Sequence, residues 1–144
     1  MVDKKVNENI EEKVNEFNNT DAINEDELLK LLVEHYGEDI GKTYEKYKDK
    51  DVYVYIFNDD DVYLFMGMKN KEFKEINKKA HELAIMKNES LEDMLKNLVV
   101  SKFVIYPELE LDELDDMEAG KFETLYELIM TASHFNTQNP VLSL

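Results

Sequence analysis

Residues 52–57 read VYVYIF, residues 62–66 read VYLFM, and the cluster NDDD at 58–61 separates them. β-Branched and aromatic side chains suit the pleated surface of a strand, whereas Asn and Asp favour turns. The pattern therefore predicts a β-hairpin over about residues 51–68. One face of it carries aliphatic side chains, and the other carries the aromatic set Tyr53, Tyr55, Phe57, Tyr63 and Phe65.

Both faces of the predicted hairpin are apolar, although two strands alone are only marginally stable in water. Helices of the same chain can cover one face. An aromatic face left open would form a docking surface for a second chain, whereas full coverage would place it in the core. The sequence leaves both alternatives open. Tyrosine favours docking, because its ring packs while its hydroxyl stays in water.

The sequence on both sides of the hairpin has helical periodicity. Apolar positions spaced by three and four predict helices over about residues 4–17, 24–36, 38–48, 71–87, 90–103 and 121–134. Gly37 is expected to end the second of these helices, and Ser90 to cap the fifth.

The fold class predicted from these elements is α+β, a mostly α-helical single domain with one antiparallel β-hairpin. We expect this domain to span residues 21–135. An N-terminal helix or arm over residues 1–20 precedes it, and an irregular tail over residues 136–144 follows it. The stripe at 4–17 fits either a helix packed at the periphery or an arm that orders on assembly.

Composition excludes several classes of function. The chain has 144 residues with 33 acidic residues and 17 basic ones, all of them lysine, so its net charge is −16. A chain this acidic and without arginine is a poor candidate for direct binding to nucleic acid or to an anionic membrane. Zero cysteines exclude disulfides and thiolate metal sites. No apolar run approaches the ~20 residues of a membrane span.

Residues 108–118 are the most acidic part of the chain, with seven acids among eleven residues and leucines between them. The preceding stretch 69–87 carries six lysines against three glutamates. This asymmetry suits head-to-tail docking or a basic partner, and a solvated loop is the alternative. The candidate partner-binding acids are Glu108, Glu110, Asp112, Glu113, Asp115 and Asp116.

No motif for catalysis or cofactor binding is present. His35, His81 and His134 belong to three different predicted helices and lack metal-ligand spacing. The cluster at 58–61 fails as an EF-hand loop, because Tyr63 and Lys69 stand where that loop needs glycine and glutamate. We therefore expect no catalytic, cofactor-binding or metal-binding residues, and a protein that is not an enzyme.

Four stretches carry a resemblance to a known group of proteins. They are YLFMGMKNKEFKEI at 63–76, VSKFVIYP at 100–107, AGKFETLYELI at 119–129 and SHF at 133–135. Together they resemble the small structural and assembly proteins of tailed bacteriophages. In that group the acidic loop commonly has the sequence Leu-x-Ala-Gly and the last stretch Ser-Gly-Phe. This chain has MEAG at 117–120 and SHF at 133–135, so it departs from the group at Met117 and His134.

The resemblance implies a non-enzymatic role in tail or baseplate construction, as a virion component or as a tail-assembly chaperone. The implied partners are other phage structural proteins, further copies of the chain included. The implied location is the host cytoplasm during assembly and, for a component that stays in the particle, the virion. An acidic DNA mimic that inhibits a host nucleic-acid-binding or defence protein is the alternative. A carboxylate-metal hydrolase is a third hypothesis.

Overall fold

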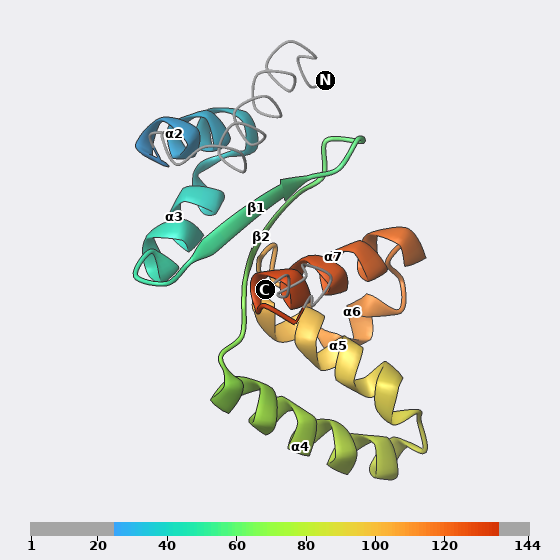
Figure 1. Cartoon of the computed structure of the whole chain (residues 1–144). Coiled ribbons are helices and arrows are strands. Elements are labelled where there is room, and N and C mark those ends of the chain that lie inside the picture. The colour runs from blue at the N-terminus through green and yellow to red at the C-terminus, as the bar shows by residue number, and fades with distance from the viewer. Residues whose placement is uncertain (1–24, 136–144) are drawn as a thin grey trace, which may run out of the picture. The chain divides into compact units, whose positions relative to one another are not determined.

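The computed structural model describes residues 25–135 (Figure 1). Within that range the chain is mostly helical with a three-stranded antiparallel sheet, so the predicted α+β class is confirmed. The expectations for residues 1–20 and 136–144 lie outside the described residues. The elements are α2 (Glu25–Tyr36), α3 (Glu38–Tyr47), β1 (Val52–Ile56), β2 (Val62–Met66), α4 (Asn70–Lys87), α5 (Leu91–Phe103), β3 (Val104–Tyr106), α6 (Leu111–Leu114) and α7 (Ala119–Ala132).

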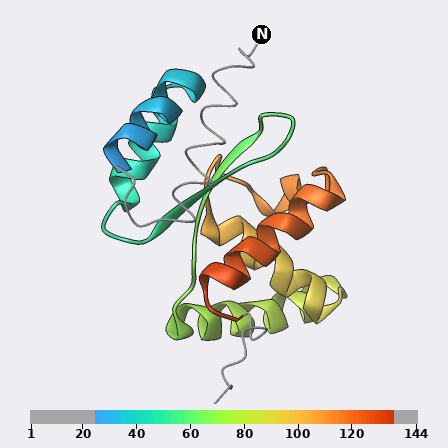
Figure 2. The same cartoon turned by 45° about the horizontal axis from the view of Figure 1, so that its top comes forward.

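The described residues divide into two compact units, residues 25–64 and residues 65–135. In the first unit α2 and α3 lie side by side (Figures 1 and 2). Gly37 joins them with a φ of 104°, which glycine adopts without the steric cost that a Cβ would bring. Its N–H donates to Val33 O at 2.9 Å, so α2 ends where the sequence predicts. The apolar side chains of Leu28, Leu32 and Ile40 are buried.

The predicted hairpin is confirmed as β1 and β2. The sheet order is β1-β2-β3, so β2 is the middle strand and β1 is an edge strand among the described residues. All five residues of β2 are buried, whereas all five residues of β1 are half-buried. The strand at the edge is therefore the more exposed half of the hairpin.

The second unit is built around α5, which packs against α4, α6 and α7. Ser90 caps α5 as predicted, because its Oγ accepts a hydrogen bond from Asp93 N–H at 3.3 Å. The predicted helices of this unit are confirmed to within a few residues at their ends. Their inward side chains include Ile76, Ala80, Ala84, Met94, Leu98, Val99, Val100, Phe103, Leu125 and Ile129.

A backbone contact fastens the end of α7 to the segment after β2. The Met68 N–H donates to Ser133 Oγ at 2.7 Å, and Ser133 Oγ donates to Ile129 O at 2.7 Å. A Cβ built on Gly67 would lie 2.6 Å from Ala132 O. Glycine is therefore required at position 67 by the close approach of two backbone segments.

Two short elements were not predicted. Residues 104–106, expected only to extend the chain, form the third strand β3. The acidic stretch, expected to be a loop, contains the four-residue helix α6. The side chain of Leu114 is buried and fixes this helix against the unit, and Ser101 Oγ donates to Leu109 O at 2.9 Å.

Candidate docking surfaces

The two faces of the hairpin are divided as the sequence predicts. The Phe57 N–H donates to Asp61 O at 2.9 Å, which places Tyr55 opposite Tyr63 and Val54 opposite Leu64. The Phe57 ring meets the rings of Tyr55 and Tyr63 edge to face, with centroid distances of 4.9 Å and 5.6 Å. Such edge-to-face pairs add to the stability of the strand pair. The aromatic side chains of the hairpin thus share one face.

Two of the predicted docking aromatics are buried, so for these two the structure shows coverage, the other of the two alternatives that the sequence leaves open. Tyr63 and Phe65 are exposed by only 6% and 4%, because they belong to the middle strand of the sheet. Tyr53, Tyr55 and Phe57 remain half-buried. Of the five predicted docking aromatics, the three that keep some exposure therefore belong to β1 and the residue after it.

The turn of the hairpin is held by an acidic side chain, where the sequence led us to expect only a solvated turn. Asp60 Oδ2 lies 2.9 Å from His35 Nε2, and Asp60 Oδ1 accepts from Tyr36 Oη–H at 2.8 Å. The His35 and Asp60 side chains are only 7% and 13% exposed. Asp60 also has a φ of 70°, which few residues other than glycine adopt readily. Asn58 and Asp59 are exposed, as expected for a turn.

A hollow of about 360 Å³ opens beside β1 in the first unit. Its apolar lining includes Leu28 and Leu32 of α2 and Val52 and Val54 of β1, so the helices lie over the aliphatic face of the strand. Charged and polar side chains also line it, namely Tyr44, Lys48, Lys50, Asp51 and Tyr53. This arrangement leaves the long edge of β1 free of any other described strand.

The predicted acidic residues all lie at the surface. The side chains of Glu108, Glu110, Asp112, Glu113, Asp115 and Asp116 are exposed. Within residues 25–135, none of them forms an ion pair. Of the leucines between them, Leu109 and Leu111 are half-buried and Leu114 is buried. Residues 108–116 therefore present negative charge outward from an anchored segment.

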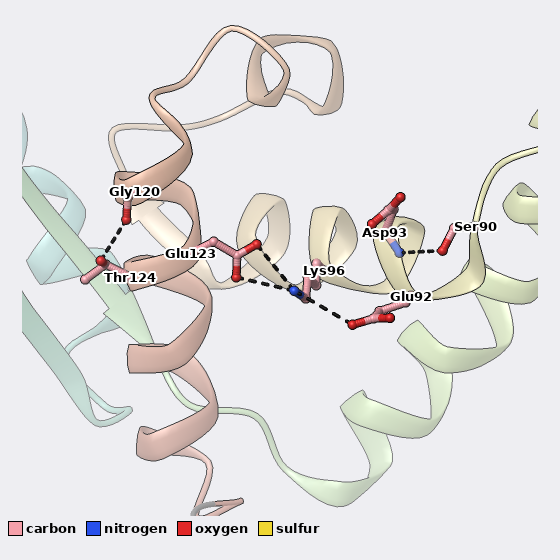
Figure 3. A network of polar contacts seen from close by, with 7 residues as sticks. All are labelled: Ser90, Glu92, Asp93, Lys96, Gly120, Glu123 and Thr124. Carbon is pink, nitrogen blue, oxygen red and sulfur yellow. Dashed lines mark hydrogen bonds and ion pairs between the residues drawn. The ribbon is translucent and has the colours of Figure 1, made fainter.

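A second hollow, in the second unit, is lined by the acids Glu89, Asp93, Asp115 and Glu123 together with Ser90, Lys96, Asn97 and Phe122. Figure 3 shows Lys96 reaching from α5 to Glu123 of α7. The Lys96 Nζ lies 3.3 Å from both carboxylate oxygens of Glu123 and 3.9 Å from Glu92 Oε1. The hydrogen bond to Glu123 raises the pKa of Lys96, and burial raises the pKa of neighbouring Tyr126.

The three histidines belong to different segments of the chain, and each has its own surroundings. His35 pairs with Asp60, His81 Nδ1 lies 2.8 Å from Asn77 O, and His134 is exposed with a φ of 64°. Among residues 25–135, no group of three or more His, Asp or Glu side chains could hold a metal ion. Neither of the two hollows described above is lined by a histidine.

One exposed apolar pair was missed by the sequence reasoning. Ile85 and Met86, at the end of α4, are 82% and 79% exposed, and nearby Leu91 is 38% exposed. The signal was present in the sequence, since these two residues lie off the apolar stripe that runs through Ile76, Ala80 and Leu83.

Comparison with known proteins adds no identification. No protein-family model, no curated protein and no solved structure matches the chain. No helix among the described residues is long and apolar enough to cross a membrane. What the protein does is therefore inferred from its own residues.

Proposed function

We propose that the protein acts by binding other polypeptides, as a non-enzymatic structural or assembly protein of a tailed bacteriophage. Its place would be in tail or baseplate construction, in the host cytoplasm and, if it stays in the particle, in the virion. The observation that carries this proposal is the contrast between β1 and β2. The middle strand β2 is fully buried, whereas all five residues of the adjoining edge strand β1 are only half-buried.

Half-exposed apolar edge strands are unusual on proteins that act alone, because they invite pairing with another chain. Here the edge strand carries Tyr53 and Tyr55, and Phe57 follows it. Aromatic side chains of this kind supply much of the binding energy at protein interfaces. The exposed Ile85 and Met86 offer a second apolar contact site on the other unit.

The test is a double variant of the edge strand, Tyr53→Ser with Tyr55→Ser, made in the phage genome that encodes the chain. We expect fewer assembled tails and loss of the protein from the tail or assembly fraction, measured by electron microscopy and mass spectrometry. The matched control is Tyr47→Ser, which removes a half-buried tyrosine from α3. Normal assembly by the double variant, with the protein absent from every assembly fraction of the native phage, would contradict the proposal.

The exposed acids of residues 108–116 favour one second candidate, an acidic inhibitor that mimics DNA. Spaced carboxylates without ion-pair partners can occupy a surface built for phosphates. Such a protein would compete with DNA for a basic host protein, and the competition would weaken steeply as salt rises. The variant Glu110→Lys with Asp112→Lys should then abolish competition, whereas binding that is insensitive to salt would favour the assembly role.

A further inference from the structure

We propose that residues 4–17 form an amphipathic helix that docks in the hollow beside β1 of the same chain. The inference goes beyond the proposed function and does not rest on it. It is carried by the wide apolar face of α2, by the apolar stripe of residues 4–17, and by the short connection between the two segments. Residues 4–17 lie outside the described range, and their pattern is that of the sequence.

α2 has a wider apolar face than one neighbouring helix covers. It has five aliphatic residues, at positions 28, 29, 31, 32 and 33, and at 100° per residue they cover an arc of about 200°. An arc of about 100° is enough for a helix that packs on one side. α3 contacts this arc at Val33, whose Cγ2 would lie 2.8 Å from a Cβ built on Gly41. The hollow is lined by Leu28, Leu29 and Leu32, which occupy the centre of the arc.

The hollow is also apolar on the side of the sheet. Val52 and Val54 of β1 and Leu64 of β2 line it. The side chains of Leu29, Val52 and Val54 are only half-buried, so apolar surface is still available there. The volume of about 360 Å³ lies at the low end for sites that hold small ligands, and it can take a few aliphatic side chains.

Residues 4–17 have an apolar stripe that fits such a hollow. Their four apolar residues are spaced by four, four and three, which places them on one face of a helix: Val6, Ile10, Val14 and Phe17. Isolated helices of about 12–15 residues are marginal in water, so this one needs an apolar surface to pack on. The segment has three lysines and four glutamates, so its docking meets little repulsion in a chain with net charge −16.

The connection between the two segments sets which residues meet. Only residues 18–24 separate the predicted helix from α2, and connections of this length join antiparallel neighbouring helices. Residues at equal distance from the turn of an antiparallel pair lie level with each other. Val14 then lies level with Leu28, and Ile10 lies level with Leu32. Because both leucines line the hollow, Ile10 and Val14 are the side chains that enter it.

The short connection favours this occupant over a second copy or a free ligand. A short tether holds a segment near its site at an effective concentration in the millimolar range, which a separate molecule has to match. Residues 136–144, the other stretch outside the described range, follow α7 of the second unit and have no such connection to α2.

The test is nuclear magnetic resonance on the full-length protein with labelled methyl groups. We expect nuclear Overhauser effects between the methyl groups of Val14 and Leu28, and between those of Ile10 and Leu32. Absence of both effects from assigned spectra would overturn the inference. A mixture of labelled and unlabelled chains separates the possible sources. Effects that cross from one chain to another would identify a second copy as the occupant and overturn docking within the chain.

A pair of variants tests the stripe without altering the hollow. Ile10→Asp with Val14→Asp should undock the segment. Helical circular dichroism should then fall, and binding of the dye ANS, which reports exposed apolar surface, should rise several-fold. The control, Asn9→Asp with Asn15→Asp, adds the same two charges off the stripe and should leave both signals near their native values. Equal changes in the two double variants, or no change in either, would overturn the contact.

Discussion

Asp60 shows how one side chain can fix a turn to a helix that precedes it by more than 20 residues. It accepts hydrogen bonds from His35 and Tyr36, two neighbouring residues whose rings lie 4.5 Å apart at right angles. The composition of the NDDD cluster predicts a turn, but it does not reveal which acid turns inward. That choice depends on the position of α2, which is a tertiary contact.

Removal of the Asp60 carboxylate should destabilise the protein. Asp60→Ala leaves His35 and Tyr36 without their acceptor and keeps a side chain at a φ of 70°. We expect the free energy of unfolding to fall by about 3 kcal/mol, measured by urea denaturation. Asp60→Gly, the control, loses the same bonds but relieves the backbone, so it should cost about 1 kcal/mol less. Equal stability of Asp60→Ala and the native protein would show that the two bonds contribute nothing.

The raised pKa of Tyr126 leads to a prediction of how the stability of the fold changes at alkaline pH. Burial raises its pKa above the usual value of 10.0, so the folded state favours the neutral phenol. This contribution is fully present below the unfolded pKa and is lost as pH rises through the folded pKa. Lys96, whose pKa Glu123 raises, acts in the same direction. Tyr126→Phe should therefore lessen the loss of stability at alkaline pH. In the ultraviolet titration of tyrosine, the variant should lose the absorbance change that occurs at the highest pH. An unchanged titration would contradict this assignment.

At the scale of elements, the sequence predicts the long helices and the hairpin because each has a strong local signal. α4 and α5 have clear apolar stripes, and β1 and β2 are dense in β-branched and aromatic residues. β3 was missed because its three residues follow α5 without a turn signal, and pairing with β2 alone makes them a strand. α6 was missed because it has only four residues and lies in the stretch 108–118, where seven acids outnumber three leucines. Burial of β2 could not be predicted, since it follows from the sheet order.

The contact between the end of α7 and the segment after β2 gives a prediction at this scale. Gly67→Ala should destabilise the protein by about 1–3 kcal/mol, because its Cβ would meet the backbone of Ala132 and neither side can yield. Gly120→Ala is the matched control. A Cβ there meets nothing within 4 Å, and alanine in the first turn of α7 should raise stability by about 0.5–1 kcal/mol. Thermal and urea unfolding of both variants would measure the difference, and a neutral Gly67→Ala would show that the backbones separate freely.

At the scale of the whole molecule, the net charge of −16 dominates behaviour in solution. Half of that net charge lies between Pro107 and the C-terminus, a stretch that contains nine acidic residues and one lysine. The sequence alone establishes this charge and the asymmetry of its distribution. The sequence does not establish which partner binds this acidic surface, because exposed carboxylates can bind any basic surface.

Self-repulsion should make stability depend on salt. We expect the melting temperature to rise between low salt and about 0.15 M NaCl, because ions screen the repulsion among carboxylates. Glu110→Gln with Asp112→Asn and Asp115→Asn should raise the melting temperature at low salt and flatten its dependence on NaCl. The control Glu75→Gln, at an exposed position on lysine-rich α4, should have a much smaller effect. A melting temperature that falls as NaCl rises would mean that attractive ion pairs outweigh repulsion.

The bond between Met68 and Ser133 joins residues 65 positions apart. At about 5–20 residues per second, the ribosome makes Ser133 roughly 3–13 s after Met68. During that interval the nascent chain has the segment after β2 but not the helix end that fastens it. The second unit can therefore close only late in translation, and ribosomes stalled before codon 133 should hold a polypeptide that proteases cut near Gly67.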